Sequence, residues 1–178
     1  GIGFAYLAMR ETERFQFSTF NEKLDVFQPR RGMSHLASMV THLNDVKTQG
    51  NSKLLEAMLQ YKKVIGSRSM LIILSDFLLS SEEIIEALYT LGDHEIRVIQ
   101  VLDPVEKELK YQGDFKLTDS ETNTVLRTYI SPRLRVQYQE MLDHHSAKIE
   151  EICNKLGIRF YQITTDTPIF EAFYKVLE

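Results

Sequence analysis

The pattern of apolar and polar residues predicts strands that alternate with helices from about residue 50 onward. Residues 69–75 contain five consecutive apolar residues between serines, which is typical of a strand covered on both faces. Residues 95–102 and 158–163 are predicted as further strands, and segments with helical spacing of apolar residues separate the three. This order predicts right-handed crossovers and a doubly wound, mostly parallel sheet. The predicted helices cover residues 1–10, 33–47, 52–65, 80–92, 132–156 and 167 onward.

Two further segments are predicted as hairpins. Residues 14–20 alternate between apolar and polar positions, and a second short strand at 23–28 ends at Pro29, so this pair suits an exposed sheet edge. Residues 105–130 are irregular and contain two short strands joined by a polar tip. We interpret them as a hairpin inserted between a strand and its helix, within one domain that spans residues 1–178.

Composition narrows the class of protein. The 178 residues carry a net charge of −4 with both signs interspersed, so nothing indicates a nucleic-acid partner. A single cysteine, Cys153, excludes an intrachain disulfide and fits a reducing compartment. No apolar run is long enough to span a bilayer and no signal peptide opens the chain, so we expect a cytoplasmic protein.

Two aspartates are the first candidates for chemistry, because each closes an apolar strand. Asp76 follows the strand at 69–75, and Asp103 follows the strand at 95–102. In open parallel α/β sheets, ligands bind outside the carboxyl ends of the strands, where two carboxylates suit a hard cation. The structural alternative is that Asp76 caps the loop before the helix at Ser80 and that Asp103 shapes an Asp-Pro turn. Both interpretations stay open at this point.

Other candidate sites are weaker. The chain has no glycine-rich phosphate-binding motif and no GxSxG nucleophile elbow. Cys153 lies among apolar residues of a predicted helix and is interpreted as a small buried hydrophobic residue. Arg127, Arg133 and Arg135 lie in or beside the segment from Tyr129 to Tyr138, where they indicate either a site for an acidic partner or a solvated basic face.

The order of several short motifs resembles a known family. Gly50-Asn51-Ser52 before a helix, followed by LIILSDF at residues 71–77, resembles the second and third parts of a von Willebrand factor A-type metal-ion-dependent adhesion site. The motifs downstream resemble the von Willebrand factor A-like family named domain of unknown function 58. They are Asp103-Pro104 with Glu106, Gly113, the sequence LTDSET at 117–122, Arg30-Arg31-Gly32 upstream, and Cys153 followed by Gly157.

The resemblance implies a Rossmann-like sheet with one antiparallel edge strand. It also implies a metal site in which Ser52 takes the place of a threonine and Asp76 that of an aspartate. The Asp-x-Ser-x-Ser loop that supplies the other ligands has no counterpart, because the chain begins inside the helix expected after it. We therefore expect an N-terminally truncated domain, lacking a strand between 14–20 and 69–75, with an incomplete site that binds Mg²⁺ weakly or not at all. Either the chain is a fragment of a longer protein, or the strands at 14–20 and 69–75 close the gap or accept a strand from a partner.

Two functions follow as expectations. The resemblance implies a non-enzymatic interaction module, an adaptor for a MoxR-type AAA+ ATPase, with self-association through exposed strand edges as a further expectation. The alternative is a metal-dependent hydrolase or nuclease that uses Asp76, Asp103 and Asp119. That alternative requires the three carboxylates to converge within about 4–6 Å of one another.

Overall fold

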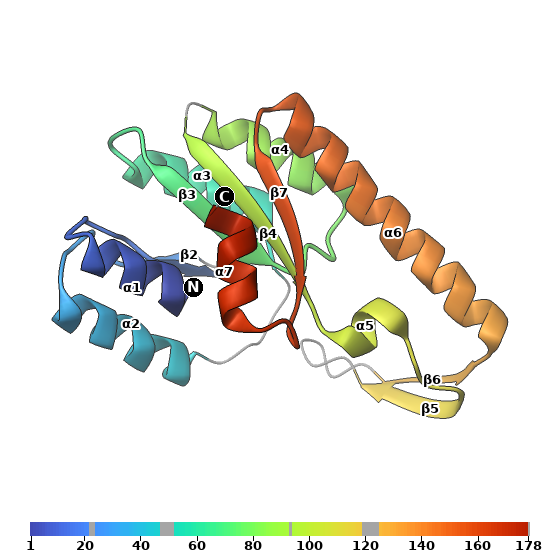
Figure 1. The fold of residues 1–178 in the computed structure, drawn as a ribbon. Coiled ribbons are helices and arrows are strands. Elements are labelled where there is room, and N and C mark those ends of the chain that lie inside the picture. Colours follow the sequence, from blue (N-terminus) through green and yellow to red (C-terminus); the bar gives the residue numbers. More distant parts are fainter. Residues whose placement is uncertain (22–23, 47–51, 93, 119–124, 178) are drawn as a thin grey trace.

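The computed structural model describes residues 1–21, 24–46, 52–92, 94–118 and 125–177. They form a mixed α/β fold, consistent with a Rossmann-like arrangement, around a parallel sheet with strand order β3-β4-β7 (Figure 1). The strands of this sheet are β3 (Met70–Ser75), β4 (Glu95–Leu102) and β7 (Arg159–Thr164). Two antiparallel pairs, β1-β2 and β5-β6, complete the strands of the described residues. None of the helices in these residues is long and apolar enough to cross a membrane.

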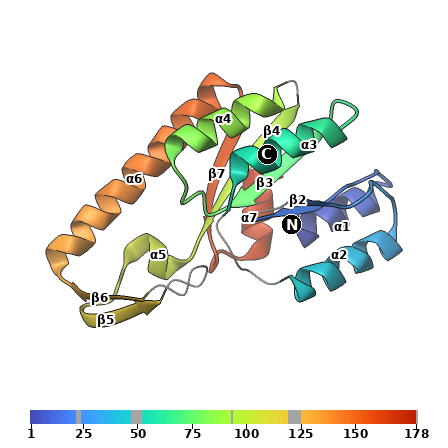
Figure 2. The same ribbon diagram turned by 180° about the vertical axis from the view of Figure 1, so that it is seen from behind.

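Helices cover the two faces of the parallel sheet unequally. Three helices, α3 (Leu54–Val64), α4 (Ser81–Leu91) and α6 (Pro132–Lys155), pack on one face and form the main core with it (Figure 2). Apolar residues of neighbouring strands meet there in register, as Ile73 does with Val98. Among the helices of the described residues, only α7 (Ile169–Leu177) lies across the opposite face of this sheet (Figure 1).

The prediction that the strand at 69–75 is covered on both faces is wrong. Leu71 and Ile73 are buried in the main core, but on the other face Met70 is 52% exposed and Leu74 is 37% exposed. The reason is that β3 is the edge strand of its sheet, whereas α7 makes its hydrogen bonds to β4 and β7. The central strand of the sheet is β4.

The N-terminal region has a smaller core of its own. Phe17 and Phe27, which flank the strands β1 (Ser18–Phe20) and β2 (Leu24–Val26), pack with α1 (Ile2–Arg10) and α2 (Met33–Asp45). The rings of Phe17 and Phe27 stack with centroids 4.1 Å apart. His35 is buried beside them, and its Nε2 atom lies 3.2 Å from the carbonyl oxygen of Phe15. A carbonyl can only accept, so Nε2 carries the proton in this tautomer.

The two sheets on either side of the expected gap do not pair. Within the described residues β1 pairs with β2 and β3 pairs with β4, so the expectation that β1 and β3 close the gap is wrong. Both sheets nevertheless contact α3. The amide of Lys53 donates to the carbonyl of Asn21 at the end of β1, and the Tyr61 hydroxyl donates to Gln16.

Helices α1 and α7 make a close contact that requires a glycine. The rings of Phe4 and Phe173 meet edge to face at 4.8 Å. A Cβ atom on Gly3 would lie 2.0 Å from the Phe173 ring, closer than any side chain tolerates. The absence of a side chain at Gly3 therefore fixes how α7 sits on the N-terminal region.

The irregular segment after β4 contains a short helix and the second hairpin. Helix α5 (Pro104–Glu108) is followed by β5 (Gly113–Thr118) and β6 (Val125–Ile130), which pair antiparallel. Helix α6 begins directly after β6, capped by the Ser131 hydroxyl, which accepts from the amide of Leu134. The hairpin lies beyond the carboxyl end of β4 (Figure 1). Because β3 runs parallel to β4, the carboxyl end of β3, which Asp76 follows, lies at the same edge of the sheet.

Candidate functional site

The chain leaves β3 through a turn that its own side chains hold. The Ser75 hydroxyl accepts from the amide of Phe77 at 3.0 Å, and Asp76 Oδ1 accepts from the amide of Leu78 at 3.2 Å. Each side chain thus binds a backbone N–H two residues ahead, as serine and aspartate do in turns. The structural alternative for Asp76 is therefore confirmed. Asp76 is exposed, and within the described chain its second carboxylate oxygen has no hydrogen-bond partner.

Phe77 turns the chain in an unusual conformation. Its φ is 54°, in the left-handed region that side chains rarely adopt, and its side chain is fully buried. The carbonyl oxygen of Phe77 lies 2.7 Å from Nε2 of His145 on α6, and Nε2 must donate because the carbonyl cannot. Packing and this hydrogen bond together keep the strained residue in place.

A buried polar network lies directly behind this turn. Gln100 on β4 is fully buried, and its Nε2 donates to the carbonyl of Asp76 at 2.9 Å. Its Oε1 accepts from the hydroxyl of Ser146 on α6 and from the amide of Gln162 on β7. The network therefore ties the backbone of the Asp76 turn to two strands and one helix, and the Gln100 amide group has partners at both its ends.

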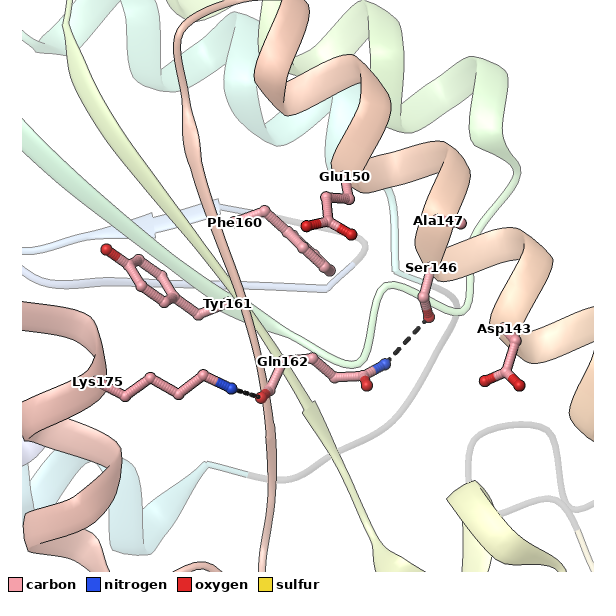
Figure 3. A pocket seen from close by; sticks show the side chains of 8 residues that line it. All are labelled: Asp143, Ser146, Ala147, Glu150, Phe160, Tyr161, Gln162 and Lys175. Carbon is pink, nitrogen blue, oxygen red and sulfur yellow. Dashed lines mark hydrogen bonds between the residues drawn. The ribbon is translucent and has the colours of Figure 1, made fainter.

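A hollow of about 360 Å³ opens beside this network, between α6, the outer edge of β7 and α7 (Figure 3). Its charged lining residues are Asp143, Glu150 and Lys175. Lys175 donates to the backbone carbonyl of Gln162 at 3.1 Å, while the Gln162 side chain turns the other way, toward Ser146 (Figure 3). The lysine thereby protects the free edge of β7 from pairing with another strand.

Ser52 lies directly before Lys53, the residue that precedes the first turn of α3. It is half-buried, and its hydroxyl has no hydrogen bond within the described chain. Three residues later the amide of Leu55 donates to Oε1 of Glu83 in the first turn of α4, at 3.3 Å. The starts of α3 and α4 are therefore joined near the carboxyl end of β3, the edge that carries Asp76. The helix-opening position before α3 is Lys53 rather than Ser52, and Gly50-Asn51 lie outside the described residues.

The same contact bears on the start of α4, where the sequence Ser80-Ser81-Glu82-Glu83 has the pattern that predicts a capping box. The Ser80 hydroxyl accepts from the amide of Glu83, as a capping box requires. The Glu83 carboxylate, however, binds the α3 amide of Leu55 instead of returning to its own helix. Sequence spacing cannot distinguish these two partners, because the second one comes from another helix.

Asp103 has a structural role in the described chain. One carboxylate oxygen caps α5 by accepting from Val105 at 2.8 Å, and Glu106 completes a capping box. The other oxygen accepts from the Thr165 hydroxyl at 3.2 Å. The Asp-Pro turn interpretation is confirmed. Asp119, the third acid of the hydrolase hypothesis, lies outside the described residues.

The donor atoms near Asp76 are few. Among the described residues, no group of three or more histidine, cysteine, aspartate or glutamate side chains has the geometry to hold a metal ion. A carboxylate and a hydroxyl are the oxygen donors that Mg²⁺ accepts, and Mg²⁺ commonly keeps several waters. The residues present therefore fit a sparsely ligated Mg²⁺, with Asp76 as the charged ligand and Ser52 as the neutral one.

Cys153 is fully buried among apolar residues of the main core, as predicted. Burial, with a smaller contribution from the nearby Glu150 carboxylate, raises the pKa of its thiol to about 12. The thiolate needed for nucleophilic chemistry is therefore strongly disfavoured at neutral pH.

Sequence reasoning missed the network behind the turn. Its members are Gln100, His145, Ser146 and Gln162. One signal was present, since Gln100 is a polar residue near the end of the apolar strand EIRVIQVL. The other three lie on amphipathic elements, where polar residues are ordinary, and only the tertiary structure brings them together.

The fold is that of a Rossmann-like α/β domain, in which helices pack on a parallel sheet. The candidate ligand-binding site lies at the carboxyl edge of this sheet. The chain belongs to the family described as "Protein of unknown function DUF58", whose profile matches residues 2–148.

The chain is also similar to several curated proteins. It is 31% identical over 99 residues to uncharacterized protein Rv1480 of Mycobacterium tuberculosis, covering 56% of this chain and 31% of that protein. It is 31% identical over 101 residues to uncharacterized protein MAV169 of Mycobacterium avium, covering 56% of this chain and 59% of that protein. The match thus spans less than two thirds of each relative.

Among solved structures, the chain resembles the conserved hypothetical protein BatB from Bacteroides thetaiotaomicron. The TM-score is 0.51 with 12% sequence identity, over 98% of this chain and 85% of that one. This likeness supports the fold alone.

Proposed function

We propose that this domain is a non-enzymatic protein-interaction module of the von Willebrand factor A type, which contacts its partner at the carboxyl edge of the sheet. Asp76 and Ser52 are the residues of this proposed adhesion site. A divalent cation, Mg²⁺ in the simplest case, is held weakly by these two side chains, and a carboxylate from the partner completes its coordination. The resemblance noted in the sequence suggests a MoxR-type AAA+ ATPase as that partner.

The observation that carries the proposal is the state of the Asp76 carboxylate. Oδ1 is committed to the turn through Leu78, and the second oxygen has no partner within the described chain, on an exposed turn at the end of a parallel strand. A side chain that was needed only for the turn would require one oxygen. The second one is available to an external ligand.

The test compares cation-dependent binding by variants that keep the turn intact. Asp76→Asn retains the oxygen that accepts from Leu78 but removes the negative charge, and Ser52→Ala removes the hydroxyl. We expect a purified MoxR-type AAA+ ATPase from the source genome to bind the unaltered domain in Mg²⁺ and to lose that binding in EDTA or with either variant. Asp25→Asn, on the exposed strand β2, is the matched control and should bind normally.

Binding that survives both EDTA and Asp76→Asn would remove the adhesion site from the proposal. A separate calorimetric titration of the domain alone with Mg²⁺ should show weak binding or none. A sub-micromolar site would mean that other residues supply the ligands.

The free edge of β3 supports self-association as a second property of this module. The Ser69 carbonyl accepts from Glu95 at the start of β4, so the backbone groups of Met70, Ile72 and Leu74 point away from β4. Within the described chain these groups pair with nothing, and two of the three side chains are exposed. Such an edge is a template for strand pairing between copies.

A further inference from the structure

Basic side chains gather where the β5-β6 hairpin leads into α6, in a chain whose net charge is −4. We name this the hairpin–helix surface and define it by Lys116, Arg127, Tyr129 and Arg133. Strand β6 ends at Ile130 and α6 begins at Pro132, so the two elements are joined without a loop between them (Figure 1).

On the hairpin, two like charges face each other. The strand register places Lys116 directly opposite Arg127, and both side chains are exposed. Opposed side chains in an antiparallel pair have Cβ atoms about 4.5–5.5 Å apart, and like charges at that distance destabilise the hairpin. Asp114 lies on the same face, opposite Tyr129, but no ion pair joins it to either cation within the described chain.

A second unfavourable arrangement follows at the start of α6. This helix has 24 residues, and its first turn contains Arg133 and no acidic residue, with Arg135 two positions further on. The amino end of a helix carries partial positive charge, so cations there are less stable than acids would be. Neither arginine forms an ion pair with any described residue.

Apolar side chains accompany these charges. Tyr129 is 58% exposed beside Arg127, and Met141 is 73% exposed two turns into α6. Val125 and Val136 are each 50% exposed. Tyrosine, methionine and arginine are the residues enriched in protein interfaces, whereas a solvated basic face would be expected to lack the apolar members.

We propose that the hairpin–helix surface binds an acidic segment of a partner polypeptide. Carboxylates of that segment pair with Lys116, Arg127 and Arg133, which relieves both unfavourable arrangements, and an apolar side chain of the same segment packs on Tyr129. Nucleic acid and an anionic membrane carry negative charge over an area much larger than this surface, so the net charge of −4 opposes their approach more than it opposes a short acidic segment. The proposal does not depend on the Asp76 site.

The test uses a fluorescent synthetic peptide rich in aspartate and glutamate with one phenylalanine, and follows its anisotropy. We expect the double variant Arg127→Thr and Arg133→Gln to weaken peptide binding about tenfold or more. The binding that remains should depend less on salt concentration than binding by the unaltered domain. Arg68→Gln, an exposed arginine in the loop before β3, is the matched control and should bind like the unaltered domain. A peptide with glutamine and asparagine in place of the acids should not bind.

A second measurement separates a binding role from a structural one. Because Arg127 faces Lys116, Arg127→Thr should keep or raise the melting temperature while it weakens peptide binding. Equal binding by the double variant and the unaltered domain would overturn the proposal. So would tighter binding of a single-stranded oligonucleotide or of phosphatidylserine vesicles than of the acidic peptide.

Discussion

His145 on α6 holds the backbone of Phe77, with 2.7 Å between its Nε2 atom and the Phe77 carbonyl oxygen. Phe77 follows Asp76 directly and has a φ of 54°. A long helix therefore sets the backbone of the turn that presents the candidate ligand. Gln100 holds the preceding carbonyl, that of Asp76, from the side of the sheet. Two successive carbonyls of the turn are thus fixed by side chains from different elements.

Replacement of this histidine should destabilise the domain. His145→Ala leaves the carbonyl of Phe77 without its donor in a partly buried place, a loss of about 1–3 kcal/mol in the free energy of unfolding. Urea denaturation followed by circular dichroism measures it. The neighbouring His144 is exposed, so His144→Ala should change stability by less than about 0.5 kcal/mol. Equal effects of the two variants would argue against the hydrogen bond to Phe77.

The network around Gln100 should be strongly coupled. Gln100 accepts from the Ser146 hydroxyl at 2.9 Å, and both residues are buried. In a double-mutant cycle with Gln100→Leu and Ser146→Ala, we expect a coupling energy of about 0.5–3 kcal/mol, because either single change already removes the hydrogen bond between the two side chains. The measurement is the free energy of unfolding of the four proteins. Simple additivity would show that the two side chains contribute independently.

Cys153 should make stability fall at alkaline pH. Its folded-state pKa is raised to about 12, whereas an unfolded thiol titrates near about 8.5. Between these values the unfolded chain loses the proton and the folded chain keeps it, so unfolding becomes easier as pH rises. The stabilising contribution of the Cys153 thiol is fully present below the pKa of the unfolded chain. It is lost as the pH rises toward the pKa of the folded protein, and the free energy of unfolding then falls by up to about 1.4 kcal/mol for each pH unit.

Chemical denaturation from neutral pH to about pH 11 tests whether Cys153 lowers stability at alkaline pH. This range covers both sides of the thiol pKa in the unfolded chain. The slope of stability against pH above the unfolded pKa should be shallower in Cys153→Ala than in the unaltered protein. Parallel curves, offset only by the cost of the substitution, would show that the thiol ionises without hindrance in the folded state.

The free edge of β3 should decide self-association. Met70→Lys with Leu74→Lys places two charges on the exposed face of this edge strand, a device that blocks edge-to-edge pairing. Light scattering across a concentration series should show less association for this double variant. Leu59→Lys, an equally exposed apolar position on α3, serves as the control. Unchanged association by the edge variant would place the contact elsewhere.

Most of the helices and strands could be located from local sequence patterns. Helical and strand periodicity located β3, β4, β7 and α6 within about two residues, because buried stripes on each element must repeat at its own period. Turn chemistry at Ser80 and Asp103 was also readable, since a capping side chain and its amide are neighbours in the chain. The site candidate Asp76 was located by the rule that ligands bind at the carboxyl ends of parallel strands.

Which neighbour each face of an element contacts could not be predicted from these patterns, because it depends on how the elements pack together. The apolar run of β3 predicted cover on two sides, but apolar character does not say which neighbour arrives, and Met70 and Leu74 are exposed. Likewise, Glu83 binds the amide of Leu55, and His145 the carbonyl of Phe77, across 28 and 68 residues of sequence. Such contacts depend on how helices dock, which is set by the whole core rather than by local periodicity.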